Sequence, residues 1–389
     1  MNSYGRQSTD LRDALVVGWQ VWRKSLTQGP KIQEFESAVA LKVGAKFAIA
    51  VSSATAGLHL AVLALELESD SEVVTSPISF LSSSNAALYS GLRPKFIDID
   101  PSTLNISIAK TVEAISKSKA IKALIPVHMA GATCDMEALS RVAKENGIAI
   151  IEDAAHALGG YYSNGRPVGS CVFSDMTVFS FHPVKSVTTG EGGVITTNSE
   201  NLYRKLLRLR SHGISQPDDS LVNPILAYTS EKKNLWYHEM QTLGYHYRLS
   251  EIQAALGVSQ LRKLDRFIKR RRVIAMNYDR LLSGISYITV TQPQFRKISA
   301  HHLYIVLIDF SKINLSRNDL MTKLRKLGIG TQVHYRPIPS QPYYVSKGYG
   351  VSSIPNAMNY YSACLSLPIY PGLKRWQQRR IVSALKSLA

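Results

Sequence analysis

The chain has 389 residues, of which 45% are hydrophobic and 19% are charged. This length suffices to bury a large core and favours two domains over one. The sequence holds no run of about 20 apolar residues, which argues against a membrane-spanning helix. The first residues lack the basic and then apolar pattern of a secretory signal, so we expect a cytoplasmic protein without a membrane partner.

The charge is strongly basic, with 46 Lys and Arg against 28 Asp and Glu and a formal net charge of +18. Nucleic acid, a small anionic substrate such as a nucleotide sugar, or a general bias of the host proteome would each account for it. The densest basic run, residues 262–272, also carries apolar residues at helical spacing, which predicts a helix with its basic face in solvent. No aromatic RNA-binding motif or zinc finger accompanies this run, so we expect no nucleic-acid partner.

Cysteine and histidine spacing gives no metal signature. Cys134, Cys171 and Cys364 lie far apart and form no CxxC pair, and the ten histidines form no HExxH pattern. We therefore expect neither a disulfide framework nor a metal site.

In chain order, the first 30 residues predict a helix, within 10–25, that packs outside the main sheet. Short Val- and Ile-rich runs then alternate with amphipathic helical stretches, which predicts an α/β fold with a mostly parallel, seven-stranded sheet covered by helices on both faces. The predicted strands are 46–53, 72–77, 94–100, 121–128, 148–155, 176–181 and 192–198. Only a loop separates the last two, so we expect an antiparallel strand there.

Beyond residue 250 the pattern changes to one long helix or two, up to about 282, followed by a smaller α+β part. That part holds predicted strands at 301–309 and 331–335, a helix at 317–328 and a final basic helix from Trp376. We divide the chain into an N-terminal helical segment (1–30), a large domain (31–260) and a small C-terminal domain (261–389).

Ligands of open parallel sheets bind at the carboxyl ends of the strands, so the residues that follow each strand matter most. Ser53, Ala54, Thr55 and Gly57 follow the first strand and open a helix. Small residues there let backbone amides approach a phosphate, and the helix dipole favours the anion. Alone this signal is weak, because small residues are common at helix starts.

Asp153 ends the fifth predicted strand, and His156 follows three residues later. A lone carboxylate at the end of a buried strand needs a partner, such as a helix amide or the protonated ring nitrogen of a cofactor. His156 would reach the same ring if the loop folds back.

The stretch "FSFHPVKSVTTGEGG" places Ser180 and Lys185 after the sixth strand, before a turn rich in glycine. A lysine amine can form a Schiff base with an aldehyde, and desolvation lowers its pKa so that the free amine becomes available. Phosphate cradle, ring carboxylate, hydroxyl donor and amine are together the contributions that a protein makes to pyridoxal-phosphate chemistry.

Five motifs carry a resemblance to a known family: "SLTQGPKIQEFE", "SSATAGLHLAV", "IEDAAHALGG", "FSFHPVKSVTTGEGG" and "YRLSEIQAALGVSQL". They resemble the DegT/StrS family of sugar aminotransferases, of fold type I among pyridoxal-phosphate enzymes, and the resemblance runs from about Tyr4 to Pro371. The segments "YGRQ", "HALGG" and "VHYRPI" look most like the subgroup that makes UDP-4-amino-4,6-dideoxy-N-acetyl-β-L-altrosamine, in the pathway to pseudaminic acid.

The resemblance implies catalytic roles for Lys185, Asp153 and His156. Lys185 would hold pyridoxal 5'-phosphate and move the proton between cofactor and sugar, Asp153 would pair with the pyridine nitrogen, and His156 would lie near the phenolic oxygen. It also implies further cofactor contacts: Ala54, Thr55 and Ser180 for the phosphate, and Phe80 stacked on the ring. By pattern alone, Phe80 would be a core residue.

The resemblance further implies a nucleotide-sugar site. Its residues would be Tyr4, Lys24, Ser25, Leu26, Thr27, Ala54, Ser180, His334, Tyr335, Arg336 and Pro337. Lys24 and Arg336 carry the positive charge that a diphosphate requires. The family is dimeric, with both subunits forming each site, so we expect a homodimer. Relatives carry Asn where this chain has His246, whose ring N–H can still donate to a cofactor phosphate from the partner subunit.

The expected activity is the transfer of an amino group from L-glutamate to C4 of a UDP-4-keto-6-deoxy-N-acetylhexosamine. Another nucleotide keto sugar, of the perosamine or bacillosamine type, is the nearest alternative. A dehydratase relative would carry histidine in place of Lys185. A non-catalytic cofactor-binding sensor, or a nucleic-acid partner of the basic surface, is the alternative of another class.

Overall fold

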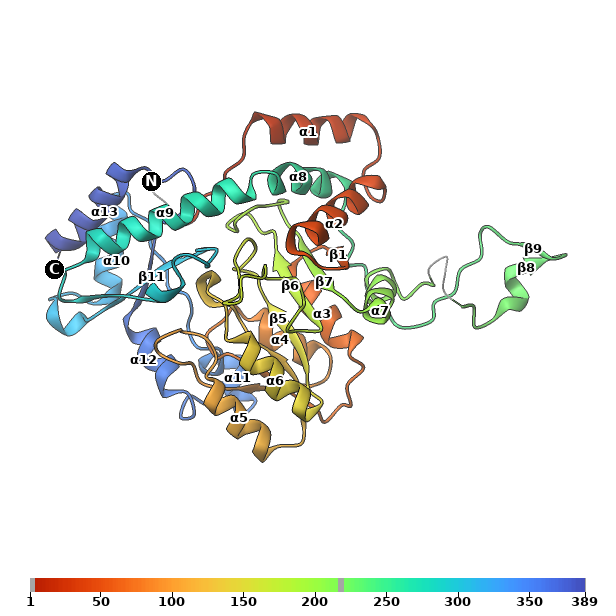
Figure 1. Cartoon of the computed structure of the whole chain (residues 1–389), viewed down its shortest axis with the longest axis horizontal. Coiled ribbons are helices and arrows are strands. Elements are labelled where there is room, and N and C mark those ends of the chain that lie inside the picture. The colour runs from red at the N-terminus through yellow and green to blue at the C-terminus, as the bar shows by residue number, and fades with distance from the viewer. Residues whose placement is uncertain (1–3, 216–219, 389) are drawn as a thin grey trace.

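The computed structural model describes residues 4–215 and 220–388 (Figure 1). Its large domain is built on a seven-stranded sheet in the order β1-β7-β6-β5-β4-β2-β3. The strands are β1 (Phe47–Val51), β2 (Glu72–Thr75), β3 (Arg93–Phe96), β4 (Ile121–Ile125), β5 (Ala149–Asp153), β6 (Met176–Ser180) and β7 (Gly193–Thr197). Only β7 runs antiparallel to its neighbours within this sheet. The predicted mostly parallel sheet and its antiparallel strand are confirmed.

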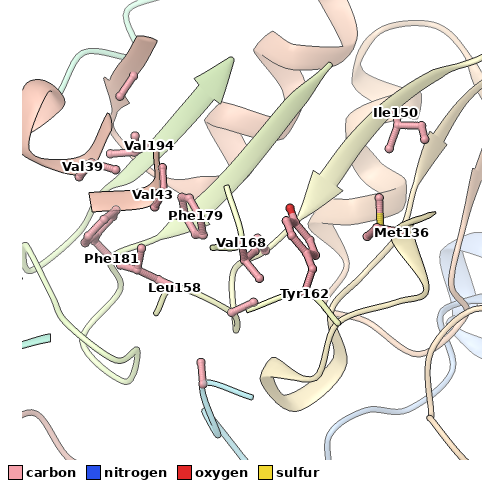
Figure 2. Packing of buried hydrophobic residues seen from close by; sticks show 14 of the residues in the cluster. Val39, Val43, Met136, Ile150, Leu158, Tyr162, Val168, Phe179, Phe181 and Val194 are labelled. Carbon is pink, nitrogen blue, oxygen red and sulfur yellow. The ribbon is translucent and has the colours of Figure 1, made fainter. Parts of the chain in front are cut away.

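Helices cover both faces of the sheet. They are α2 (Pro30–Val43), α3 (Ala54–Ala64), α4 (Ser82–Tyr89), α5 (Ile108–Lys117), α6 (Met136–Asn146), α7 (Glu200–Arg210) and α8 (Glu251–Leu261). Side chains of a strand alternate between the two faces. On β6, Phe179 packs with Val39 and Val43 on the face that α2 covers, as Figure 2 shows, whereas Val178 packs on the α3 face. The same alternation places Ser180 on the α3 face, at the carboxyl end of β6.

Helix α1 (Leu11–Trp22) lies outside the sheet and packs on α8, as predicted (Figure 1). Asp10 and Asp13 close its first turn as a capping box. The buried Asp13 carboxylate also accepts hydrogen bonds from Lys263 Nζ at 2.7 Å and from Ser259 Oγ at 2.6 Å. These contacts hold α1 to the body through its first turn.

The small domain is built on the antiparallel sheet β10-β11-β12. Its elements are α9 (Leu264–Leu282), β10 (Ile288–Val290), β11 (Tyr304–Ile308), α10 (Arg317–Lys326), α11 (Pro342–Ser346), α12 (Pro355–Ala363), β12 (Cys364–Leu367) and α13 (Arg375–Leu388). Short 3₁₀ helices lie at η1 (Met129–Gly131), η2 (Pro224–Ala227), η3 (Pro293–Phe295), η4 (Phe310–Lys312) and η5 (Ile338–Ser340).

The strand predicted at 331–335 is wrong. This segment makes only an isolated bridge, between Gln332 and Ser366. His334 Nδ1 lies 2.8 Å from Ser366 Oγ, and the Tyr335 side chain turns toward the large domain. These neighbouring side chains make separate polar contacts, and the segment does not extend the strand pairing beyond the bridge. The sequence also missed β10 and β12, which are only three and four residues long.

Helix α9 joins the two domains, because Phe267 and Ile268 belong to the core of the large domain and Ile274 and Tyr278 to that of the small domain. The prediction that the basic run 262–272 faces solvent is wrong in part. The guanidinium of Arg271 is buried and donates to the carbonyls of His301, His302 and Ile369. Arg270 and Arg272 likewise donate to loop carbonyls, so much of this run holds loops of the small domain in place.

An arm, defined here as residues 220–243, projects far from the body (Figure 1). It carries the short hairpin β8 (Tyr228–Thr229) and β9 (Lys232–Lys233), and it exposes large apolar side chains such as Leu235, which is 99% exposed. Within the described ranges, none of the helices has the length and apolarity that a membrane crossing requires.

Candidate active site

A cavity of about 440 Å³ lies where the carboxyl ends of β1, β5 and β6 meet the small domain. The large domain contributes the strand ends and the start of α3, and the small domain contributes His302 and residues 332–335. Tyr4 reaches the cavity from the N-terminal segment, where its carbonyl accepts a hydrogen bond from the Ile369 amide. Two domains and the N-terminal segment therefore enclose one space of ligand size.

The start of α3 forms one wall of the cavity. Ser53 caps the helix, since its Oγ accepts a hydrogen bond from the Ala56 amide. Ala54 and Thr55 lie in the first turn of the helix, where backbone amides have no carbonyl of the same helix to donate to, so their amides are available to an anion. A Cβ on Gly193 would meet the Ser53 carbonyl carbon at 2.6 Å and the Ala54 nitrogen at 2.7 Å. Glycine at position 193 lets β7 pass directly behind the start of α3.

Asp153 lies buried at the end of β5, on the same face of the sheet as Ser180. Ser83 Oγ of α4 donates to Asp153 Oδ2 at 2.5 Å, and the Ala155 amide donates to Oδ1 at 3.1 Å. The backbone of Asp153 is held as well, because its amide donates to the Pro126 carbonyl and its carbonyl accepts from the His128 amide. Two hydrogen bonds thus orient the carboxylate, and two more fix the backbone that carries it.

Behind Asp153, the adjacent Glu152 points to the opposite face of the sheet and is buried. Its carboxylate lies 2.6 Å from His128 Nε2 and accepts from Tyr162 Oη at 2.8 Å. His128 Nδ1 accepts a hydrogen bond from the Cys134 amide at 3.2 Å, so the ring is neutral and its proton lies on Nε2, which donates to Glu152. This hydrogen bond ties the segment that follows β4 to β5.

Lys185 lies in the loop that returns the chain from β6 to the antiparallel β7. The Lys185 amide donates to the His182 carbonyl, and Thr188 Oγ1 and the Thr189 amide both donate to the Phe181 carbonyl. Burial lowers the pKa of the Lys185 amine to about 8, against the opposing charge of Asp153. Within residues 4–215 and 220–388, the amine has no ion-pair partner, so it is available for chemistry.

Three histidines, His156, His302 and His334, gather on the small-domain side of the cavity. Burial, together with the nearby Lys185 charge, lowers the pKa of each, to about 3 for His334, so all three are neutral near pH 7. His156 Nε2 lies 3.1 Å from Tyr335 Oη, and among the described residues the buried Nδ1 atoms of His156 and His302 have no hydrogen-bond partner. In the part of the chain that the structure describes, no cluster of His, Cys, Asp and Glu could hold a metal ion.

The cavity brings together most of the residues predicted from the sequence. They are Tyr4, Ala54, Thr55, Phe80, Asp153, His156, Ser180, Lys185, His334 and Tyr335. Phe80 is not a core residue: its side chain is largely exposed, and its ring lies edge-on to that of Tyr335.

The remaining predicted residues lie outside this cavity. Lys24, Ser25, Leu26 and Thr27 form the turn between α1 and α2, where the Leu26 carbonyl accepts from the Glu251 amide. Arg336 donates to Ser340, and Pro337 begins the turn that contains it. His246 bridges to Ser211 at the base of the arm. Their roles remain predictions.

Sequence reasoning missed several residues of the site, above all Ser83, His302, Glu191 and Gln332. Ser83 stands in a run of three serines, and nothing in that run singles out the one that faces Asp153. His302 follows another histidine at the start of a strand, where period-two alternation predicts opposite directions for the two rings. That alternation could have indicated that one of the two rings faces the cavity.

A scan against protein-family models matches the DegT/DnrJ/EryC1/StrS aminotransferase family over residues 11–386. Among curated proteins, the chain is 38% identical over 382 residues to the spore coat polysaccharide biosynthesis protein SpsC of Bacillus subtilis, covering 97% of this chain and 93% of SpsC.

Two solved structures illustrate the structural similarity. Helicobacter pylori PseC, an aminotransferase involved in the biosynthesis of pseudoaminic acid, superposes with a TM-score of 0.89 at 32% identity, covering 99% of this chain and 98% of PseC. The PLP-form of Spr1654 from Streptococcus pneumoniae gives a TM-score of 0.87 at 27% identity, covering 99% and 97% of the two chains.

Proposed function

The chain belongs to the DegT/DnrJ/EryC1/StrS aminotransferase family, and we propose that it uses pyridoxal 5'-phosphate to aminate a nucleotide sugar. The amino donor is L-glutamate, and the acceptor is C4 of a UDP-4-keto-6-deoxy-N-acetylhexosamine. One observation carries the proposal: a single cavity holds the Lys185 amine, the buried Asp153 carboxylate and the start of α3.

The residues of the cavity fit this cofactor. The α3 amides of Ala54 and Thr55, together with the Ser180 hydroxyl, suit a phosphate. Asp153 suits a protonated ring nitrogen, and His156 keeps a buried Nδ1 without a partner, as a hydrogen-bonding group near the ring would require. When bound, pyridoxal phosphate supplies an aldehyde that accepts the amine and a ring that withdraws electrons from the substrate.

The chain's own residues then bind, orient and move protons. Lys185 would hold the cofactor when no substrate is bound, and its neutral amine would take up and return the proton at the reacting carbon. The buried Asp153 carboxylate, held by Ser83, would pair with the ring nitrogen and favour its protonated form. Phe80, which lines the cavity, would pack against the ring and limit the access of water.

The small domain and the N-terminal segment are the source of sugar selectivity in this proposal. His334 and Tyr335 line the cavity beside Tyr4, whose ring lies 5.2 Å from that of His334. The similarity to PseC supports an N-acetylated amino-sugar precursor of the pseudaminic type. A perosamine- or bacillosamine-type sugar is the alternative within the family.

We propose that the enzyme is a homodimer with shared active sites. The arm and the outer face of α1 expose large apolar side chains, among them Leu235, Trp236, Leu11 and Trp22, which a second copy would cover. Lys24 to Thr27, Arg336 and His246 lie outside the cavity of a single chain, so their predicted contacts require the partner subunit or a larger ligand.

The test is amination of a defined panel. The purified chain, pyridoxal phosphate and L-glutamate are incubated with UDP- and dTDP-4-keto sugars, and products are identified by mass spectrometry and NMR. Amination of the UDP-4-keto-6-deoxy-N-acetylhexosamine at C4, absent from the Lys185→Ala control, is the expected result. Amination of dTDP sugars alone would contradict the assigned substrate, and cofactor binding without any transfer would contradict an aminotransferase.

A further inference from the structure

The net charge of the chain is confined to its small domain. Residues 1–260 contain 24 basic and 24 acidic residues, whereas residues 261–389 contain 22 basic and 4 acidic residues and no glutamate. The whole excess of +18 therefore lies in the last third of the chain. A bias of the host proteome would affect both domains alike, so it does not explain this division.

The excess charge lies mostly at the surface, on three helices that pack side by side, α9, α10 and α13. We call their exposed surface the basic face. Six of its cations have no acidic partner among the residues that the structure describes: Arg266, Lys269, Arg325, Lys326, Arg375 and Arg379. The four acidic residues of the domain interact with other groups; for example, Asp279 forms an ion pair with Arg296, and Asp309 forms one with Lys312.

Apolar side chains stand among these cations. On α9, the exposed positions 266, 269, 273, 276 and 280 follow helical spacing and therefore share one face. Val273 and Met276, which are 43% and 42% exposed, separate the cations of that stripe. On α13, Trp376 is 62% exposed between Arg375 and Arg379. On an anionic membrane surface, lipid headgroups can take exposed cations while the interfacial region takes neighbouring Trp and aliphatic side chains.

The part of the basic face on α10 and α13 is remote from the arm: in Figure 1 these helices lie at the opposite end of the molecule. None of the six cations lines the cavity. This part of the face is therefore available to another partner while the enzyme works.

We propose that the basic face docks this enzyme onto the surface of a bilayer that contains anionic phospholipids. The cations would neutralise lipid headgroups, and Trp376 would enter the interfacial region, without any segment crossing the membrane. Nucleic acid would satisfy the cations but not Val273 and Met276, which favours the bilayer. The proposal revises the sequence-based expectation that the protein has no membrane partner.

The test compares vesicle binding of the full chain and two charge-matched variants. Co-sedimentation uses vesicles of pure phosphatidylcholine and vesicles of equal parts phosphatidylcholine and phosphatidylglycerol, at low and physiological salt. We expect binding to the anionic vesicles only, weakened by salt. Arg375→Glu, Arg379→Glu and Lys386→Glu together should weaken binding by at least about 100-fold, because each cation near an anionic surface contributes several-fold.

The matched control carries Lys119→Glu, Arg141→Glu and Lys144→Glu, which change the net charge equally on the exposed surface of the large domain. This control should bind nearly as well as the unchanged chain. Trp376→Ala should weaken binding at high salt, where the apolar contribution dominates. Equal loss in both triple variants, absence of binding to anionic vesicles, or salt-sensitive binding to duplex DNA in place of vesicles would each overturn the proposal.

Discussion

Ser83 donates a hydrogen bond of 2.5 Å to Oδ2 of Asp153, and this bond links α4 to the end of β5. Ser79 Oγ lies 2.5 Å from Ser83 Oγ, so the carboxylate ends a short chain of hydroxyls. Both serines are buried. The direction of the Asp153 carboxylate therefore depends on a helix that carries no charged residue of its own.

Replacing Ser83 by Ala removes one donor from a buried carboxylate. A hydrogen bond to a charged group contributes about 1.5–3 kcal/mol, so we expect cofactor affinity to fall by about 10- to 100-fold. Fluorescence titration of the apoenzyme with pyridoxal phosphate measures this affinity. Ser84→Ala is the matched control, since Ser84 contacts Tyr344 and not Asp153. Equal cofactor affinities in the two variants would contradict the role given to Ser83.

Lys185→Ala should abolish turnover and covalent attachment of the cofactor while leaving the fold intact, because the side chain makes no hydrogen bond within the described ranges. Borohydride reduction followed by mass spectrometry detects the attachment, and thermal melting reports the fold. Lys185→Arg should also be inactive, since a guanidinium stays protonated. Transamination above the uncatalysed rate in either variant would refute the assignment of Lys185.

The pH dependence of cofactor attachment follows from the pKa of Lys185, which burial lowers from its ordinary 10.5 to about 8. Only the neutral amine attacks an aldehyde, so the rate of attachment to the apoenzyme should rise with pH through about 8 and then level off. Asp153 opposes this shift, so Asp153→Asn should move the midpoint to lower pH. Stopped-flow absorbance measures the rate, and a midpoint near 10 would show that burial does not act on this amine.

Tyr335→Phe removes the hydrogen bond between Tyr335 Oη and His156 Nε2, which are 3.1 Å apart. A neutral hydrogen bond contributes about 1 kcal/mol, so we expect kcat to fall roughly fivefold with little change in cofactor affinity. Steady-state kinetics with saturating glutamate separates the two effects. A large loss of cofactor with unchanged kcat would instead place Tyr335 in the cofactor cradle.

Shared active sites predict complementation between inactive variants. In a mixture of Lys185→Ala and His246→Ala subunits, half of the dimers are mixed, and each mixed dimer has one site with both residues intact. Activity should recover to about one quarter of that of the unchanged enzyme, after correction for any residual activity of each variant. Size-exclusion chromatography confirms that the subunits exchange. No gain over the separate variants would contradict a cross-subunit role for His246.

The sequence predicted the large domain well because each of its strands is a short Val- and Ile-rich run followed by polar residues. Asp153, Ser180 and Lys185 could be found for that reason, since parallel strands end at one edge. Ser83 could not be found, because it contacts Asp153 from a helix, and for His302 the alternation marks only one of two neighbouring histidines, since it reaches the cavity from the other domain. Such contacts depend on packing between segments that are far apart in sequence, and a local sequence pattern does not predict that packing.

For the basic run in α9, the local sequence pattern predicted the wrong environment for some of the cations. Its spacing predicted a face in solvent, yet Arg271 is buried and its Nη1 donates to three backbone carbonyls. A guanidinium presents five donors and can replace the hydrogen bonds of several loop carbonyls at once, which no propensity scale records. Local pattern found the helix but not the direction of its cations.

Helix α9 belongs to two separate cores, and the cavity lies at the seam between them. The two units also share a buried cluster, in which Met129 and Ala130 of the large domain pack with Ile305 of the small domain, so their melting is coupled through this packing as well as through α9. A ligand that touches Asp153 on one side and Tyr335 on the other binds only when both units are folded, and it stabilises them together by mass action. Calorimetry should accordingly show two overlapping transitions without ligand and a single, sharper one when the cavity is filled.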